Sequence, residues 1–124
     1  MESFGTSFMP SAFRARRLEA SDYDKGFFDL LGALTQVGDV SREHFEETFE
    51  KVQKEPDSYF VIVIEEVDSG KLAAAGTLLV EQKFIRNCGK VGHIEDIVVS
   101  PNFQGCGLGK VLIRVLSDIS KDIS

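Results

Sequence analysis

The stretch from Gly92 to Arg114 constrains the fold of this chain most, because it joins three signals of local structure in a fixed order. His93–Val99 predicts a strand, a proline-containing turn follows, and three alternate glycines in Gly105–Gly109 open directly onto an apolar helical pattern. Glycines let backbone N–H groups approach a ligand closely, and a helix N-terminus adds partial positive charge. The stretch therefore predicts a strand, a loop and a helix that together bind an anion such as phosphate.

The composition limits the classes of function. A chain of 124 residues with 43% apolar and 27% charged residues is typical of one small soluble domain. The net charge of −6 disfavours broad nucleic-acid binding. We see no apolar run near the roughly 20 residues of a membrane span and no signal peptide, and we expect a cytoplasmic location. Cys88 and Cys106 are expected to be free thiols, and with His44 and His93 they lack metal-ligand spacing, so no metal is expected.

Hydrophobic periodicity predicts an α+β domain over residues 13–124, behind a flexible N-terminal arm at residues 1–12. One helix is expected from an N-cap at Ser21 through Leu34, with Asp22 favouring the positive end of its dipole. A polar loop is expected at residues 81–92. The remaining predicted elements are strands at 13–18, 59–64, 72–80 and 93–99, and helices at about 41–55 and 107–121.

The glycine loop distinguishes between known families of anion-binding loops. A dinucleotide-binding loop would need an early β-α-β unit with an acid on the next strand, and a P-loop would need Ser or Thr where Val111 follows Lys110. Gln104–Gly109 instead resembles the Gln/Arg-x-x-Gly-x-Gly/Ala loop of the GNAT superfamily of acyl-CoA N-acyltransferases. The resemblance implies the GNAT fold, with a central mixed, mostly antiparallel sheet flanked by helices.

Three further segments narrow this resemblance: Leu34–Gly38, Glu81–Arg86 and Gly92–Val99. In order and spacing they are similar to the glucosamine 6-phosphate N-acetyltransferase family, and the similarity runs from about Phe13 to the end of the chain. The resemblance implies transfer of an acetyl group from acetyl-CoA to the amine of D-glucosamine 6-phosphate. The products are N-acetyl-D-glucosamine 6-phosphate and CoA, within UDP-N-acetylglucosamine biosynthesis.

The resemblance also implies which residues bind acetyl-CoA. In the GNAT pattern a bulge splays the central strand, so that backbone groups of the strand pair with the pantetheine arm. The Ile97 N–H is the candidate that polarises the thioester carbonyl, and the glycine loop would hold the pyrophosphate. The residues expected to bind the cofactor are Ile97, Val98, Val99, Gln104, Gly105, Cys106, Gly107, Leu108, Gly109 and Lys110.

The acceptor residues follow from the same resemblance, and they are Thr35, Lys83, Phe84, Ile85, Arg86, Glu95 and Asp96. Glu95 and Asp96 are two adjacent acids inside an apolar strand, which is costly unless they face a cavity or partners. Glu95 is the candidate proton acceptor, directly or through water, with Asp96 or a residue beyond this chain as alternatives. Lys83 and Arg86 would give an acidic protein a local positive site, although a solvated loop explains them equally well.

The chain departs from the family pattern at its C-terminal end. The family continues with another strand, a helix and a last strand, and this part builds much of the dimer interface. We therefore expect a homodimer if that region is supplied, and weak or no catalysis by the chain alone. The alternative hypothesis is an acetyl-CoA-binding or dimer-modulating remnant with little turnover.

Overall fold

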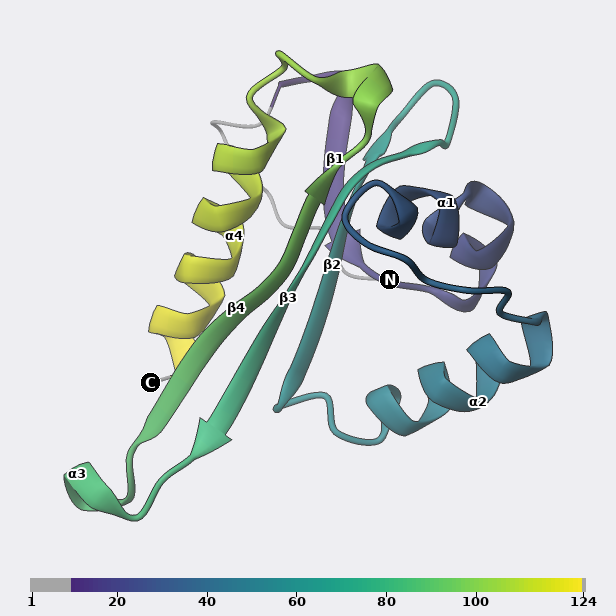
Figure 1. Ribbon diagram of the computed structural model, residues 1–124. Helices are drawn as coiled ribbons and strands as arrows, with labels where there is room; N and C mark the ends of the chain where they lie inside the picture. Colours follow the sequence, from purple (N-terminus) through teal and green to yellow (C-terminus); the bar gives the residue numbers. More distant parts are fainter. Residues whose placement is uncertain (1–9, 124) are drawn as a thin grey trace.

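The computed structural model describes residues 10–123, which form one sheet with helices on both faces (Figure 1). Residues 1–9 of the expected flexible arm lie outside the described part. Along the chain the elements are β1 (Phe13–Arg17), the 3-10 helix η1 (Ala20–Lys25), α1 (Phe27–Gly32), α2 (Arg42–Gln53), β2 (Tyr59–Glu66), β3 (Leu72–Gln82), α3 (Ile85–Cys88), β4 (Lys90–Val99), the 3-10 turn η2 (Pro101–Phe103) and α4 (Leu108–Ile123).

The sheet is a meander of the order β1-β2-β3-β4, and each neighbouring pair is antiparallel. The apolar run Tyr59–Ile64 lies in β2 between β1 and β3, which confirms its prediction as a central strand. Within residues 10–123, β4 is an edge strand. The α+β class is therefore confirmed, and the glycine loop follows directly from this edge.

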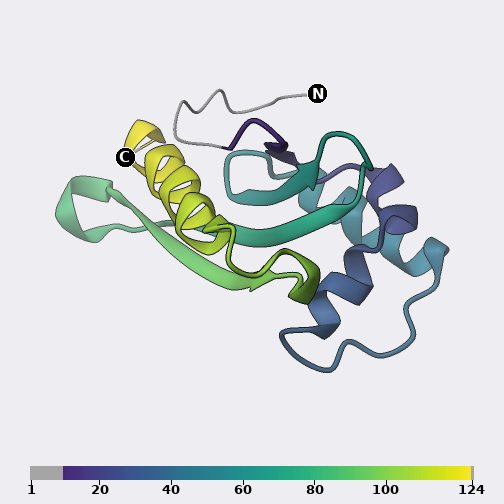
Figure 2. The ribbon, with the colours of Figure 1, turned by 90° about the horizontal axis from the view of Figure 1, so that it is seen from above.

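Each face of the sheet packs against different helices (Figure 2). The alternation of β2 places Ile62 and Ile64 in a core with Leu112 and Leu116 of α4. Val63 points the other way, into a second core with aromatic side chains of α1 and α2 such as Phe45. The molecule is consequently a three-layer sandwich, with α4 alone on one face and α1 and α2 on the other.

The prediction of one continuous helix after β1 is wrong. The chain forms η1, turns at Gly26 with φ of +85°, and then starts α1. Because glycine adopts this left-handed conformation without steric cost, it ends one helix and begins the next. The cap is Glu19 rather than Ser21, and Asp22 lies in the first turn of η1 as expected, where it accepts from the Glu19 N–H although it is fully buried.

A buried ion network explains the position of Asp22. The Arg16 guanidinium donates to both carboxylate oxygens of Asp22 at 2.8 and 2.7 Å, and to Glu65 at 3.2 and 3.3 Å. Asp22 also accepts from the backbone N–H of Glu19 at 2.8 Å. The carboxylates of Asp22 and Glu65 raise the pKa of Arg16, which stays charged inside the protein. The network ties η1 to β1 and β2 and so fixes where α1 begins.

The prediction of a polar loop at residues 81–92 is also wrong. The hairpin continues to the pair Gln82 and Lys90, and a short turn, α3, connects the two strands. Its backbone is left-handed at Arg86, Asn87 and Cys88, with φ of 54°, 58° and 57°. Backbone pairing between β3 and β4 thus carries polar residues well beyond the core, into a projecting arm (Figure 1).

Candidate active site

A β-bulge interrupts β4 in the middle of the predicted site. Ala75 pairs with Val98 and Thr77 pairs with Glu95, so that Gly76 of β3 faces two residues, Asp96 and Ile97. Asp96 is left-handed with φ of 53°. A bulge adds one residue to a strand and re-aims the side chains around it. The bulge expected from the sequence resemblance is therefore present, in the edge strand β4 and with the extra residue at Asp96.

Gly76 is required by the bulge for a steric reason. A Cβ added there would lie 2.5 Å from Cδ1 of Ile97 and 3.0 Å from Cδ2 of Leu112. The Ile97 side chain thus packs over the backbone of β3 against α4. The sequence signal was the run of small residues in Leu72–Val80, which indicates close packing without saying what packs there.

The outer edge of β4 presents backbone groups beyond the bulge. The Ser100 N–H donates to the Ala73 carbonyl at 2.8 Å, which fixes which residues face β3. Because residues in an antiparallel ladder alternate, Val98 faces β3 and the backbone groups of Ile97 and Val99 face away from it. The Val99 carbonyl accepts from the Gln104 side chain at 3.2 Å. The edge and the glycine loop are thereby joined.

The glycine loop lies between this edge and α4. Gly105 and Gly107 have φ of +88° and +75°, and an added Cβ at either position would meet nothing within 4 Å. The first helical hydrogen bond runs from the Val111 N–H to the Gly107 carbonyl at 3.2 Å, so the N–H groups of Leu108–Lys110 have no partner within the helix. Open space beside left-handed glycines at a helix N-terminus fits the close approach of a pyrophosphate, as in acetyl-CoA. Cys106 is an exposed free thiol, as is Cys88, which confirms both predictions.

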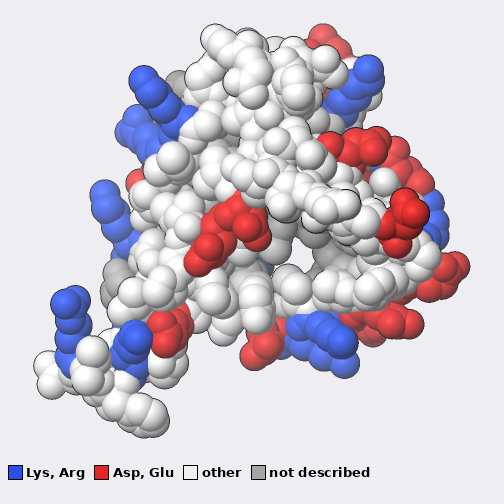
Figure 3. All heavy atoms as spheres, in the orientation of Figure 1, with Lys and Arg blue, Asp and Glu red and all other residues white. Residues whose placement is uncertain are grey.

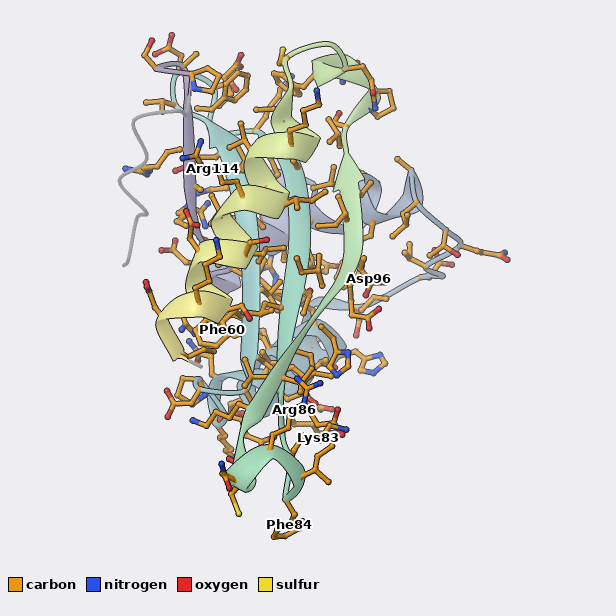
Figure 4. The ribbon with its side chains drawn as sticks, turned by 90° about the vertical axis from the view of Figure 1, so that its left-hand side faces the viewer. Phe60, Lys83, Phe84, Arg86, Asp96 and Arg114 are labelled. Carbon is orange, nitrogen blue, oxygen red and sulfur yellow. The ribbon has the colours of Figure 1, made fainter. Side chains whose placement is uncertain are left out.

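The predicted acceptor residues fall into separate groups. Glu95 and Asp96 are exposed on β4, and Thr35 is exposed just after α1, where its N–H donates to the Leu31 carbonyl at 3.1 Å. Lys83–Arg86 lies instead at the tip of the arm, below Asp96 in Figure 4. Glu95 lies five positions along β4 from Lys90 at the arm's end, which is about 17 Å along an antiparallel strand. The described chain does not bring the two groups together.

The arm carries its own electrostatic cluster. Glu81 accepts from His93 Nε2 at 2.9 Å and pairs with Lys83 Nζ at 3.1 Å. Hydrogen bonds lower the pKa of Glu81, and the bond from His93 has a larger effect than the bond from Lys83. Phe84 and Ile85 at the tip are 91% and 66% exposed. Lys83 is consequently already paired with an acid of its own hairpin, a contact that no spacing rule in the sequence reveals.

A cavity of about 320 Å³ opens on the face of the sheet that carries α1 and α2. Asp96 lines it, together with Thr77 and Ala75 of β3 and Val61 of β2. Asp96 thus faces a cavity, which is one of the two arrangements expected for an acid within this apolar strand. The sequence did not predict that Val61 and Thr77 line this cavity, although a threonine within an apolar strand is a weak signal.

The bulged edge strand, the glycine loop and the helix after it are the arrangement of an acyl-CoA-dependent acetyltransferase. Residues 17–123 match the family model described as Acetyltransferase (GNAT) family. The chain belongs to this family. Its fold is similar to a crystal structure of glucosamine-6-phosphate N-acetyltransferase from Arabidopsis thaliana, with a TM-score of 0.86, 49% identity, and coverage of 89% of this chain and 75% of that one.

Sequence relatives point to the same group within the family. A protein named Glucosamine 6-phosphate N-acetyltransferase from Arabidopsis thaliana is 48% identical over 93% of this chain and 77% of its own length. A protein named Glucosamine 6-phosphate N-acetyltransferase 1 from Dictyostelium discoideum is 44% identical over 92% of this chain and 72% of its own. Among the described residues, no helix is long and apolar enough to cross a membrane.

Proposed function

We propose that this chain transfers the acetyl group of acetyl-CoA to the amine of D-glucosamine 6-phosphate. The main supporting observation is that the outer edge of β4 runs from the bulge at Asp96–Ile97 to the glycine loop, which Gln104 joins to Val99. This path supplies backbone groups for an extended arm and then for a pyrophosphate. The acceptor is proposed from the names of relatives that are 48% and 44% identical over most of the chain.

The donor half of the site uses the backbone. Acetyl-CoA supplies a thioester whose carbonyl carbon bonds to the amine as the C–S bond breaks. The Ile97 N–H points away from β3 and would donate to the carbonyl oxygen as negative charge develops there. Ile97 and Val99 would pair with the pantetheine arm, while Val98 anchors the strand to β3. Gln104 and the loop through Lys110 would hold the pyrophosphate.

The acceptor half uses the acids of β4. We propose that Glu95 receives the ammonium proton, directly or through water, and that Asp96 orients the sugar beside the bulge. Thr35 would contact the sugar, and Lys83–Arg86 its phosphate. Because Lys83–Arg86 lies on the projecting arm, this last role fits best if the arm reaches the site of a second copy. A homodimer is thus part of the proposal, and we separately propose a cytoplasmic location.

A CoA-release assay with acetyl-CoA and glucosamine 6-phosphate tests this function. Gly107→Ala should raise the KM for acetyl-CoA, because the added Cβ would enter the open space beside the loop that the pyrophosphate is proposed to approach. Glu95→Gln should lower kcat, whereas the neighbouring Asp96→Asn should mainly raise the KM for the sugar. Acetyl-CoA that neither shifts the melting temperature nor releases CoA would overturn the proposal.

Light scattering with and without Phe84→Ser tests the dimer.

A further inference from the structure

The cavity beneath the bulge has the chemistry of a hydrocarbon site. Its walls come from α1, α2 and the sheet, and most of its side chains are apolar. Aromatic rings from both helices, Phe27, Phe28 and Phe45, line one side, and Val61 and Ala75 line the other. A volume of about 320 Å³ is at the lower end of the roughly 300–1,000 Å³ found for small-molecule pockets. A methyl group would fill a small part of it.

The cavity meets the proposed reaction centre at one residue. Asp96 lines the cavity and is the inserted residue of the bulge, directly before Ile97. Figure 3 shows the molecule hollowed between the sheet and the α1–α2 layer, with acidic side chains beside the opening. An acyl group held by the Ile97 N–H therefore has the mouth of an apolar cavity one residue away.

The sugar phosphate is a poor match for this space. The polar side chains that line the cavity are His44, Thr48, Thr77 and Asp96. The Thr48 hydroxyl already donates to the His44 carbonyl at 3.0 Å, within its own helix. A sugar would need several matched hydrogen bonds to replace water, and a hydrocarbon chain needs none. The polar acceptor is therefore expected at the mouth, beside Asp96, and the apolar part of the donor inside.

We propose that this cavity is an acyl pocket, and that the enzyme also transfers acyl groups longer than acetyl, such as butyryl, from acyl-CoA. The inference rests on the proposed function, because it places the donor carbonyl at Ile97. In the step, the amine nitrogen forms a bond to the acyl carbonyl carbon and the C–S bond breaks. The amine loses one proton, the sulfur leaves as the thiol of CoA with one proton, and no redox partner is involved.

The test compares acetyl-, butyryl- and hexanoyl-CoA by calorimetric titration without the amine. Each methylene that enters the pocket should tighten Kd about fourfold, the factor given by about 0.8 kcal/mol per buried CH₂. Mass spectrometry after addition of glucosamine 6-phosphate should detect the N-butyryl product. A Kd that is equal or weaker for butyryl-CoA than for acetyl-CoA would overturn the pocket while leaving acetyl transfer intact.

Variants with larger side chains in the cavity are compared with a variant that adds the same volume outside it. Val61→Phe should remove the gain from longer chains and leave the Kd for acetyl-CoA within about twofold of the wild type, as should Ala75→Val from the neighbouring strand. Val67→Phe adds the same volume at an exposed turn residue and should keep the gain. Melting temperatures identify any variant that fails to fold. If both filled variants fold and still bind butyryl-CoA like the wild type, the inference is wrong. If no acyl-CoA binds at all, the inference and the proposed function fail together.

Discussion

At both ends of β4 the chain turns through left-handed backbone conformations, but the residue types in these conformations differ. At one end the glycine loop turns through left-handed residues that are glycines, Gly105 and Gly107. At the other end the arm turns through three consecutive left-handed residues that all carry side chains, Arg86, Asn87 and Cys88. Glycine adopts this conformation freely, whereas other residues are strained in it by about 1–3 kcal/mol each. The loop end is therefore relaxed and the arm end strained.

The ion pairs of the body of the protein and of the arm also differ. In the body, Glu65 of β2 is buried and is held by Arg16 and Arg14 of β1. On the arm, Glu81 is held by His93 and Lys83, but all three side chains are substantially exposed. Exposed pairs contribute little to stability, and buried pairs cannot lose a partner without a large cost. The body should determine the global stability, and the arm should tolerate change and serve recognition.

The largest effect is expected in the body, at Arg16. Arg16→Ala leaves Asp22 and Glu65 as buried carboxylates without their shared counter-ion, and breaking such a network costs about 3–5 kcal/mol. Urea denaturation should show this loss as a lower midpoint with an unchanged slope. The matched arm variant, Lys83→Ala, should leave the midpoint nearly unchanged. Equal losses in the two variants would contradict the division between body and arm.

A smaller effect is expected at the contact that supports the bulge. Gly76→Ala forces the Ile97 side chain, 2.5 Å from the new Cβ, to move, and overpacking of this kind costs about 1–3 kcal/mol. Because Ile97 would also shift its N–H, kcat should fall more than tenfold with a smaller change in the KM for acetyl-CoA. Kinetics measured well below the melting temperature separate the two effects. A stable variant with unchanged kcat would remove Ile97 from the oxyanion role.

The same contrast explains what the sequence predicts about this molecule. The glycine loop, α4 and the central strand β2 were predicted because glycine spacing and apolar periodicity are local signals. The break at Gly26 was missed because Ser21 and Asp22 indicate a helix start and the apolar face of α1 follows a few residues later. The arm was missed because its pairing is between strands and its turn contains no glycine at the left-handed positions. The burial of Asp22 was missed because it depends on Arg16, which also holds the distant Glu65, and this buried network forms only in three dimensions.

Two substitutions on the arm should separate its effect on stability from its proposed contact with the sugar phosphate. Arg86→Gly and Cys88→Gly both replace a left-handed residue, and each should raise stability by about 0.5 kcal/mol, because relief of the strain exceeds the added chain entropy of glycine. Arg86→Gly should also raise the KM for glucosamine 6-phosphate, since it removes a proposed phosphate contact. Cys88→Gly should leave that KM unchanged and so serves as its control. If both variants lose stability, the left-handed turn is not a source of strain.

The smallest effect is expected on the pH at which acid unfolds the protein. Burial raises the pKa of Glu65, but hydrogen bonds from Arg16 and Arg14 outweigh it and hold the pKa below its ordinary value of 4.5. A carboxylate with a lowered pKa stabilises the fold above the unfolded pKa, and this contribution is lost as the pH falls through the folded pKa. Arg14→Gln removes a positive charge and the guanidinium that donates to Glu65 from Nε and Nη2, so the pKa of Glu65 should rise and acid unfolding, followed by circular dichroism, should begin at a higher pH. Glu81→Gln on the arm should not move that transition, because its ion pairs are exposed and screened by water. A shift caused by Glu81→Gln but not by Arg14→Gln would place the acid-sensitive contact on the arm and reverse the comparison.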